Sequence, residues 1–203
     1  MTVLVIDYGM GNIASARRAI EECGGRVVVS ADPVGLQDAD HIVLPGVGAF
    51  PLAMERLHVA GWVEPLRSAV LDRGVPMLGV CLGMQLLVDE GDEVTKTKGL
   101  GLIPGKVQRM VPANRAERVP HVGWNEVRHR DDPLFQGIPS GADFYFVHSY
   151  HCVPRDDATI VATTPYAGDF VCAVRQGNVA GVQFHPEKSS RAGFRLLKNF
   201  LAL

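Results

Sequence analysis

A short apolar run that leads into a glycine–cysteine–glycine turn constrains this chain more than any other feature. The residues from Val75 to Gln85 read VPMLGVCLGMQ, which predicts a buried strand, a sharp turn at Cys81 and then a helix. Gly79 and Gly83 lack the Cβ atoms that such a turn would crowd. The following helix would point its N–H groups at the sulfur, which favours the nucleophilic thiolate. The pattern predicts a nucleophilic cysteine, and a core cysteine between packing glycines is the alternative.

This arrangement is the cysteine counterpart of the G-x-S-x-G nucleophile elbow. In that elbow the backbone N–H of the next residue, here Leu82, helps to stabilise the oxyanion of an acyl-transfer intermediate. A second glycine-rich segment, Pro45-Gly-Val-Gly48, directly follows the apolar run 41–44. Its glycines free the backbone to point N–H groups at the same oxyanion, although an ordinary strand-to-helix turn is the alternative.

A general base for the cysteine is present near the end of the chain, in the segment GVQFHPEKS. His185 precedes a proline and is biased to an extended backbone, so Glu187, two residues later, shares its side of the chain. A carboxylate beside an imidazole orients the ring and raises its basicity. The two segments together predict a Cys81–His185–Glu187 relay of nucleophile, base and orienting group. Taken alone, a His-Pro pair is more often a turn.

Together these segments resemble the class I glutamine amidotransferases, a family with a G-x-C-x-G elbow and a late H-P-E. Further motifs resemble the glutaminase subunits of imidazole glycerol phosphate synthase: Asp7–Asn12 (DYGMGN), Pro45–Phe50 (PGVGAF), Pro120–Asn125 (PHVGWN) and Tyr145–Tyr150 (YFVHSY). The resemblance covers essentially the whole chain, and no catalytic position departs from the family pattern. It implies hydrolysis of L-glutamine to glutamate and ammonia through a thioester intermediate.

The resemblance also implies roles for further residues. The oxyanion hole would be formed by Val47, Gly48 and Leu82, and in the family the Val47–Gly48 peptide is thought to turn when the partner enzyme is loaded. Residues of the elbow helix and two later segments would bind glutamine: Gln85, one helical turn after the nucleophile, with Glu93, His148, Ser149 and Tyr150. Three residues match positions at the subunit interface of the family: Trp124, Tyr145 and Lys188.

Ammonia released into water at neutral pH would be lost as ammonium, so we expect a glutaminase to pass it directly to an acceptor site. We expect no second catalytic domain in this chain to provide one. The resemblance implies a heterodimer with a (β/α)8 cyclase subunit, which would use the ammonia to make imidazole glycerol phosphate and AICAR in histidine biosynthesis.

Three alternatives remain, the first of them within the same enzyme class. One is the glutaminase of another ammonia-channelling synthase, such as pyridoxal phosphate synthase, which would share the relay but lack the PHVGWN and DYGMGN motifs. Another is a γ-glutamyl hydrolase or a cysteine peptidase, which would use the same relay without a partner. A catalytically silent binding module would be expected to lack a member of the relay, and none is lacking.

Length and composition are ordinary for a globular chain. With 203 residues, 47% hydrophobic and 21% charged, we expect one amidotransferase domain over residues 1–203. A net charge of −2 gives no general attraction to nucleic acid or anionic membranes. No apolar run approaches the ~18 residues of a membrane span, and we expect no leader before the first strand. We expect a cytoplasmic protein. The cysteine and histidine spacings predict no disulfide or metal site. We also expect no cofactor, because Asp7 beside the short glycine pattern Gly9-Met-Gly11 would repel a dinucleotide pyrophosphate.

Strand-like and helix-like segments alternate in the first half of the chain. The expected strands there are 2–7, 26–29, 41–44 and 77–80, with helices at 12–23 and within 51–73. Six strand candidates follow, at 106–110, 125–128, 144–147, 159–164, 170–175 and 179–184, before a helix at 190–201, and a loop is expected at 111–118. The sequence predicts an open α/β sheet, mixed but mostly parallel, with helices on both faces, flavodoxin-like and of the class I amidotransferase kind.

Overall fold

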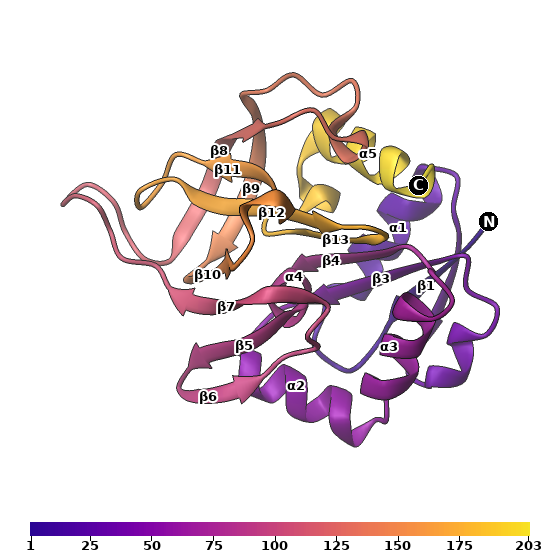
Figure 1. Ribbon diagram of the computed structural model, residues 1–203. Helices are drawn as coiled ribbons and strands as arrows, with labels where there is room; N and C mark the ends of the chain where they lie inside the picture. Colours follow the sequence, from indigo (N-terminus) through magenta and orange to yellow (C-terminus); the bar gives the residue numbers. More distant parts are fainter.

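The computed structural model describes residues 1–203, whose strands form one 13-stranded sheet (Figure 1). The strands are β1 (Thr2–Ile6), β2 (Arg26–Ser30), β3 (His41–Gly46), β4 (Met77–Cys81), β5 (Val88–Glu93), β6 (Thr95–Lys98), β7 (Ile103–Arg109), β8 (His121–His129), β9 (Ala142–His148), β10 (Tyr150–Pro154), β11 (Ile160–Thr164), β12 (Phe170–Gln176) and β13 (Val179–Val182). The main path is β2-β1-β3-β4-β13-β12-β10-β7-β5-β6, and β11, β8 and β9 branch from β12.

Five α-helices complete the fold: α1 (Ile13–Glu22), α2 (Phe50–Val59), α3 (Val63–Leu71), α4 (Leu82–Leu86) and α5 (Ser190–Leu201). Helices α1 and α5 lie on one face of the first strands, whereas α2, α3 and α4 lie on the other (Figure 1). None of these helices has both the length and the apolar character needed to cross a membrane.

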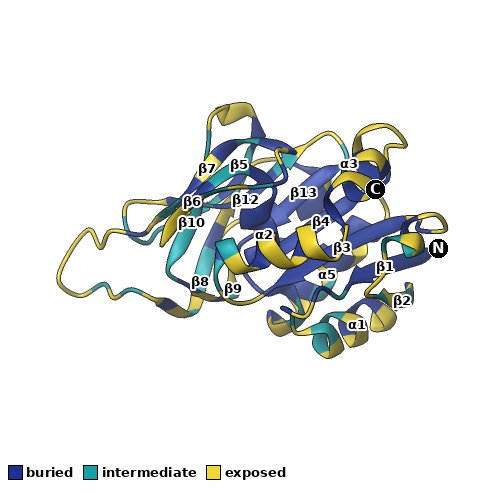
Figure 2. Cartoon of the chain, turned by 90° about the horizontal axis from the view of Figure 1, so that it is seen from below, coloured by how far each residue is buried: buried dark blue, intermediate teal, exposed yellow.

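The N-terminal half is a parallel sheet buried on both faces. Strand β1 pairs in parallel with β2 and β3, and β4 pairs in parallel with β3 and β13. Every residue of β1, β3 and β4 is buried, because helices cover both faces (Figure 2). This burial explains why these strands read as continuous apolar runs instead of alternating patterns.

The second half of the sheet is mainly antiparallel. Strand β12 pairs antiparallel with β10, β11 and β13, and β8 pairs antiparallel with β9 and β11. The prediction of an open, mixed α/β sheet with helices on both faces is therefore confirmed. The predominance of parallel pairs holds only for the first half of the sheet.

Three strands are absent from the sequence-based prediction. Strands β5 and β6 read VDEGDE and TKTK, and these polar sequences lack the apolar residues by which a strand is recognised. Strand β6 lies at the edge of the sheet, and most of its residues are exposed. Only Ser149 separates the end of β9 from the start of β10, so the sequence shows no turn between the two strands. The expected loop at 111–118 is observed, and it extends away from the sheet on the left of Figures 1 and 2.

Candidate active site

The proposed catalytic segments meet at the carboxyl ends of three adjacent parallel strands. Strand β4 lies between β3 and β13, with Gly46 paired to Cys81 and Val182 paired to Val80. The loop after β3, the turn after β4 and the segment after β13 therefore leave the sheet at the same edge. In open α/β sheets this edge is where ligands bind.

Cys81 occupies a sharp turn between β4 and the short helix α4. Its backbone has φ 56° and ψ −111°, a conformation that non-glycine residues rarely adopt. The turn brings α4 so close to the sheet that a Cβ atom on Gly83 would lie 1.8 Å from the carbonyl oxygen of Leu44. The expected strand, turn and helix are present. However, α4 contains only five residues, so its dipole is small.

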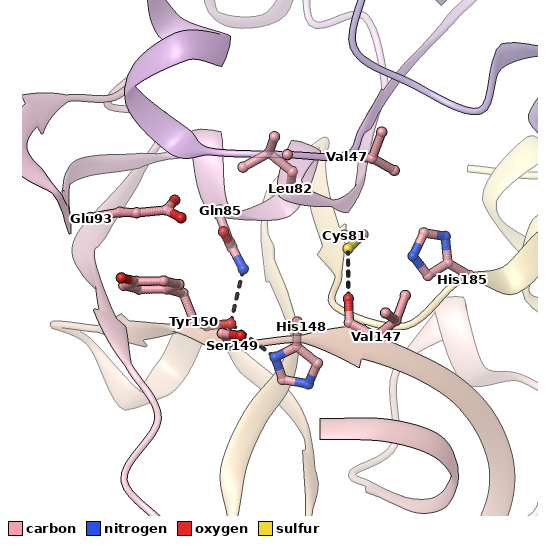
Figure 3. Close-up of a pocket in the computed structure, with 11 residues that line it drawn as sticks. Val47, Cys81, Leu82, Gln85, Glu93, Val147, His148, Ser149, Tyr150 and His185 are labelled. Atoms are coloured by element: carbon pink, nitrogen blue, oxygen red, sulfur yellow. Dashed lines mark hydrogen bonds between the residues drawn. The ribbon is translucent and has the colours of Figure 1, made fainter. Parts of the chain in front are cut away.

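His185 lies beside Cys81 and is held by Glu187. Nδ1 of His185 is 2.9 Å from Oε1 of Glu187, and the two side chains are only 3% and 5% exposed. Nε2 of His185 has no hydrogen-bond partner and is directed at the sulfur (Figure 3). Burial alone would lower the pKa of His185, but the interactions with Cys81 and Glu187 outweigh it and raise the pKa to about 9. This environment favours the protonated imidazolium form of His185.

Two further groups contact the sulfur of Cys81. The amide Nε2 of Gln183 lies 3.7 Å from Sγ, and the Val147 carbonyl oxygen lies 3.9 Å from the same atom. Sequence reasoning missed both residues. Gln183 is completely buried. The one sequence signal for its role is a polar glutamine within the apolar run before His185, where a hydrophobic residue is expected.

The glycine-rich loop after β3 forms one wall of the site. Val47 and Gly48 line the same pocket as Leu82, so the structure brings the three predicted oxyanion-hole residues together. The N–H of Val47 donates to the Met10 carbonyl at 3.3 Å, however, and is therefore turned away from the pocket. Gly48 has φ 110°, and its N–H donates no hydrogen bond within the chain.

The pocket has a volume of about 320 Å³, which suits a ligand of amino-acid size (Figure 3). Val147 and His185 also line the pocket. The remaining wall is formed by the five predicted substrate-binding residues: Gln85, Glu93, His148, Ser149 and Tyr150. Glu187 does not line it and lies behind His185. The carboxylate of Glu93 accepts the N–H of Phe50 at 2.7 Å, which holds it at the start of α2.

Next to the pocket, strands β8 and β9 expose an apolar and aromatic surface: Val122, Trp124, Tyr145 and Val147. Together with the adjacent Lys188, from the short helical turn Pro186–Lys188, we call it the β8–β9 outer face. Val122 is paired with Val147 and Trp124 with Tyr145. The rings of Trp124 and Tyr145 meet edge to face with centroids 6.0 Å apart, and Nζ of Lys188 lies 5.7 Å from the Tyr145 centroid. The Trp124 side chain is 54% exposed, so the three predicted interface residues form one cluster open to solvent.

The remaining cysteines and histidines do not form another centre. All four cysteines are free, and no group of three or more His, Cys, Asp or Glu residues is placed to hold a metal ion. Burial raises the pKa of the Cys152 and Cys172 thiols well above the usual range. Cys81 is the cysteine that lines the pocket.

Comparison with known sequences matches residues 4–203 to the family described as "Glutamine amidotransferase class-I". Two relatives named "Imidazole glycerol phosphate synthase subunit HisH" align over nearly their whole length. The protein from Moorella thermoacetica is 50% identical, with 98% of this chain and 93% of the relative aligned. The protein from Syntrophotalea carbinolica is 46% identical, with 98% of each chain aligned.

Solved structures of low sequence identity share the fold. The PurLQS structure from Thermotoga maritima has a TM-score of 0.75 at 19% identity and covers 99% of this chain and 97% of that one. A glutamine amidotransferase from Thermotoga maritima has a TM-score of 0.67 at 20% identity, with 95% and 78% covered.

Proposed function

Because this chain belongs to the class I glutamine amidotransferase family, we propose that it is the glutaminase subunit of an imidazole glycerol phosphate synthase. The arrangement of Cys81, His185 and Glu187 at one end of a pocket of amino-acid size carries the proposal. The assignment to histidine biosynthesis rests on relatives that align over nearly their whole length and are named as this synthase subunit. The chain would act as a single domain over residues 1–203, in the cytoplasm, without a cofactor.

The reaction proceeds through a thioester on Cys81. His185 takes the thiol proton, and the thiolate attacks the side-chain carbonyl carbon of glutamine to form a tetrahedral oxyanion. The imidazolium then protonates the departing nitrogen, the C–N bond breaks and ammonia leaves. His185 next removes a proton from water, which attacks the thioester and releases glutamate and the free thiol. Glu187 contributes by orienting His185 and stabilising its charge.

Charge complementarity supports the substrate-binding roles. Glu93 places a carboxylate in the pocket, which suits the ammonium of an amino acid. Gln85, His148, Ser149 and Tyr150 add polar side-chain and backbone groups around the same space. The proposed oxyanion hole uses N–H groups from Leu82 and from the Val47–Gly48 loop.

The acceptor of the ammonia would be a (β/α)8 cyclase subunit docked on the β8–β9 outer face. Aromatic residues with an adjacent cation are typical of the energetically important centres of protein interfaces. This face is joined directly to the catalytic base, because the carbonyl of Tyr145 accepts the N–H of His185 at 2.9 Å. Docking there would also cover Val147, which lines the pocket.

The proposed function is tested by purifying the chain together with the cyclase subunit of the same organism. The complex should convert glutamine and the acceptor nucleotide into glutamate and imidazole glycerol phosphate in equal amounts, with little ammonia released into solution. Stable association with a pyridoxal phosphate synthase subunit instead would favour the other ammonia-channelling synthase. Hydrolysis of γ-glutamyl peptides without a partner would favour the hydrolase alternative.

We predict that the isolated chain hydrolyses glutamine ~100-fold more slowly than the complex loaded with acceptor. In the observed conformation the N–H of Val47 is bonded to Met10, so one oxyanion donor is unavailable until the loop turns. Raising the turned state from ~1% to ~99% requires about 5.5 kcal/mol of differential contact, which a partner would supply. Glutamate release by the chain, with and without its partner, measures the ratio.

Gly48→Ala should disturb this activation, because Gly48 has φ 110° and a Cβ atom there strains the loop. The matched control is Gly61→Ala, a glycine with φ 71° at the end of α2, where a Cβ atom meets nothing within 4 Å. An isolated chain as fast as the loaded complex would contradict the prediction. So would equal behaviour of the two alanine variants.

A further inference from the structure

A chain of hydrogen bonds connects β8 with the pocket and includes a histidine that no catalytic step uses. His121 lies opposite His148, with Nδ1 of His121 3.0 Å from Nε2 of His148. Nδ1 of His148 is 2.9 Å from the carbonyl oxygen of Tyr150, and Nδ2 of Asn125 is 3.3 Å from Nε2 of His121. Both rings are buried, at 3% and 6% exposure.

The groups at the two ends determine which atom donates in every bond. The Tyr150 carbonyl can only accept, so Nδ1 of His148 carries a hydrogen and its neutral Nε2 accepts from His121. At the other end, the amide oxygen of Asn125 accepts the N–H of Glu126 at 2.9 Å, which directs the NH₂ group of Asn125 at His121. Nε2 of His121 therefore accepts. An additional proton on either ring would face another donor and break a bond.

The surroundings keep both rings neutral and in place. Burial lowers the pKa of His121 to about 4 and that of His148 to about 3. The ring of Tyr166 stacks on His121 with centroids 4.0 Å apart, and Phe146 and Phe170 pack against both histidines. At neutral pH each group in this series therefore donates to the next: Asn125 to His121, His121 to His148, and His148 to the carbonyl of Tyr150.

The same carbonyl determines how Gln85 is oriented in the pocket. The Tyr150 oxygen accepts from Nε2 of Gln85 at 2.9 Å, and that nitrogen also donates to Oε1 of Gln183 at 3.0 Å. Both hydrogens of the Gln85 amide are thus used. Its oxygen is left without a partner, and it points away from the Tyr150 carbonyl (Figure 3).

We propose that His121 is a positioning residue for glutamine binding, which acts through His148 and the Tyr150 carbonyl to hold the Gln85 amide with its oxygen available to substrate. His121 does not line the pocket, so its effect must pass through these groups. An amide oxygen there accepts hydrogens from a carboxamide or an ammonium and repels a carboxylate, which favours glutamine over glutamate. The identity of the substrate rests on the proposed function above.

The test compares three variants in the complex with the cyclase. His121→Phe keeps an aromatic ring but removes both nitrogens, and it should raise the KM for glutamine about tenfold while kcat changes less than about twofold. His121→Asn keeps a donor near the position of Nδ1 and should recover most of the loss. Synthesis from added ammonia should be unchanged in both variants, because it bypasses the pocket.

The third variant, His129→Phe, is the matched control. His129 lies on the same strand, stacks on Phe135 and hydrogen-bonds to the carbonyls of Arg130 and Ile138, but it has no link to the pocket. Its replacement should leave the KM unchanged. An equal rise in KM for the two phenylalanine variants, or a loss of kcat at constant KM in His121→Phe, would overturn the proposal.

A spectroscopic measurement separates this proposal from the glutaminase function. The ¹⁵N shifts of the His148 ring at pH 7 should report a neutral ring with hydrogen on Nδ1, whether or not the protein hydrolyses glutamine. The Nε2–H tautomer or a charged ring would overturn the positioning role. Absence of glutamine hydrolysis in the unmodified complex would instead overturn the proposed function and leave the ring assignment standing.

Discussion

Cys81→Ala is expected to abolish glutamine-dependent synthesis by the complex while synthesis from added ammonia stays within about twofold of the unmodified enzyme. The sulfur forms the only covalent bond to substrate in the proposed mechanism, and no other cysteine lines the pocket. Removal of a nucleophile of this kind typically lowers kcat by several orders of magnitude, ~10⁶-fold in the best-studied triad. Parallel assays with glutamine and with ammonium salts measure both activities.

Cys172→Ser is the matched control, because Cys172 is also a free, buried cysteine but lies away from the pocket. It should retain glutamine-dependent activity. A reactive glutamine analogue should label Cys81 in preference to the other three cysteines, as peptide mapping would reveal. Comparable glutamine hydrolysis by Cys81→Ala would exclude the elbow cysteine as nucleophile.

The catalytic candidates could be predicted from sequence because their signals are local. The turn at Cys81 needs small residues on both sides, and Gly83 meets a contact that no side chain would tolerate. Glu187 lies two residues from His185, and the structure places their side chains within hydrogen-bond distance. Residues so close in sequence must also lie close in space, so their arrangement can be predicted without knowing the rest of the fold.

Other parts of the site depend on contacts between distant segments, which periodicity does not reveal. The pairing of His121 with His148 follows from the register of β8 on β9, 27 residues apart. The contact of Gln183 with the sulfur of Cys81 spans 102 residues. The bond from Val47 to Met10 depends on one backbone orientation of a glycine-rich loop, which the sequence leaves open.

Strands β5 and β6 show that prediction of the fold from sequence is limited in the same way. The segment of β5 and β6 carries charged and small polar residues, so neither strand has the apolar alternation that identifies a half-buried strand. Their pairing is nevertheless important to the site. Strand β5 ends at Glu93 and brings that carboxylate to the pocket and to the N-terminus of α2.

His185→Ala is expected to lower kcat/KM for glutamine ~10²–10⁴-fold, the range typical of a general acid–base group. Its Nε2 is a buried imidazole nitrogen directed at the sulfur (Figure 3), and the other group near the sulfur, the amide of Gln183, cannot act as a base. Glu187→Gln should have a smaller effect, because the Glu187 carboxylate hydrogen-bonds to the base and does not line the pocket. Steady-state rates of glutamate release by the complex measure both losses, and His129→Ala is the control for loss of an imidazole elsewhere.

The pH dependence distinguishes orientation by Glu187 from a direct catalytic role. Cys81 and Glu187 hold the pKa of His185 at about 9, so the imidazolium needed to protonate departing ammonia is present below that pH and is lost above it. Removing the Glu187 charge withdraws one of these stabilising contributions and should lower the pKa of His185. The alkaline fall in kcat/KM should therefore move to lower pH in Glu187→Gln. An alkaline limb that does not move, or a Glu187→Gln variant weaker than His185→Ala, would reverse the roles assigned to the two residues.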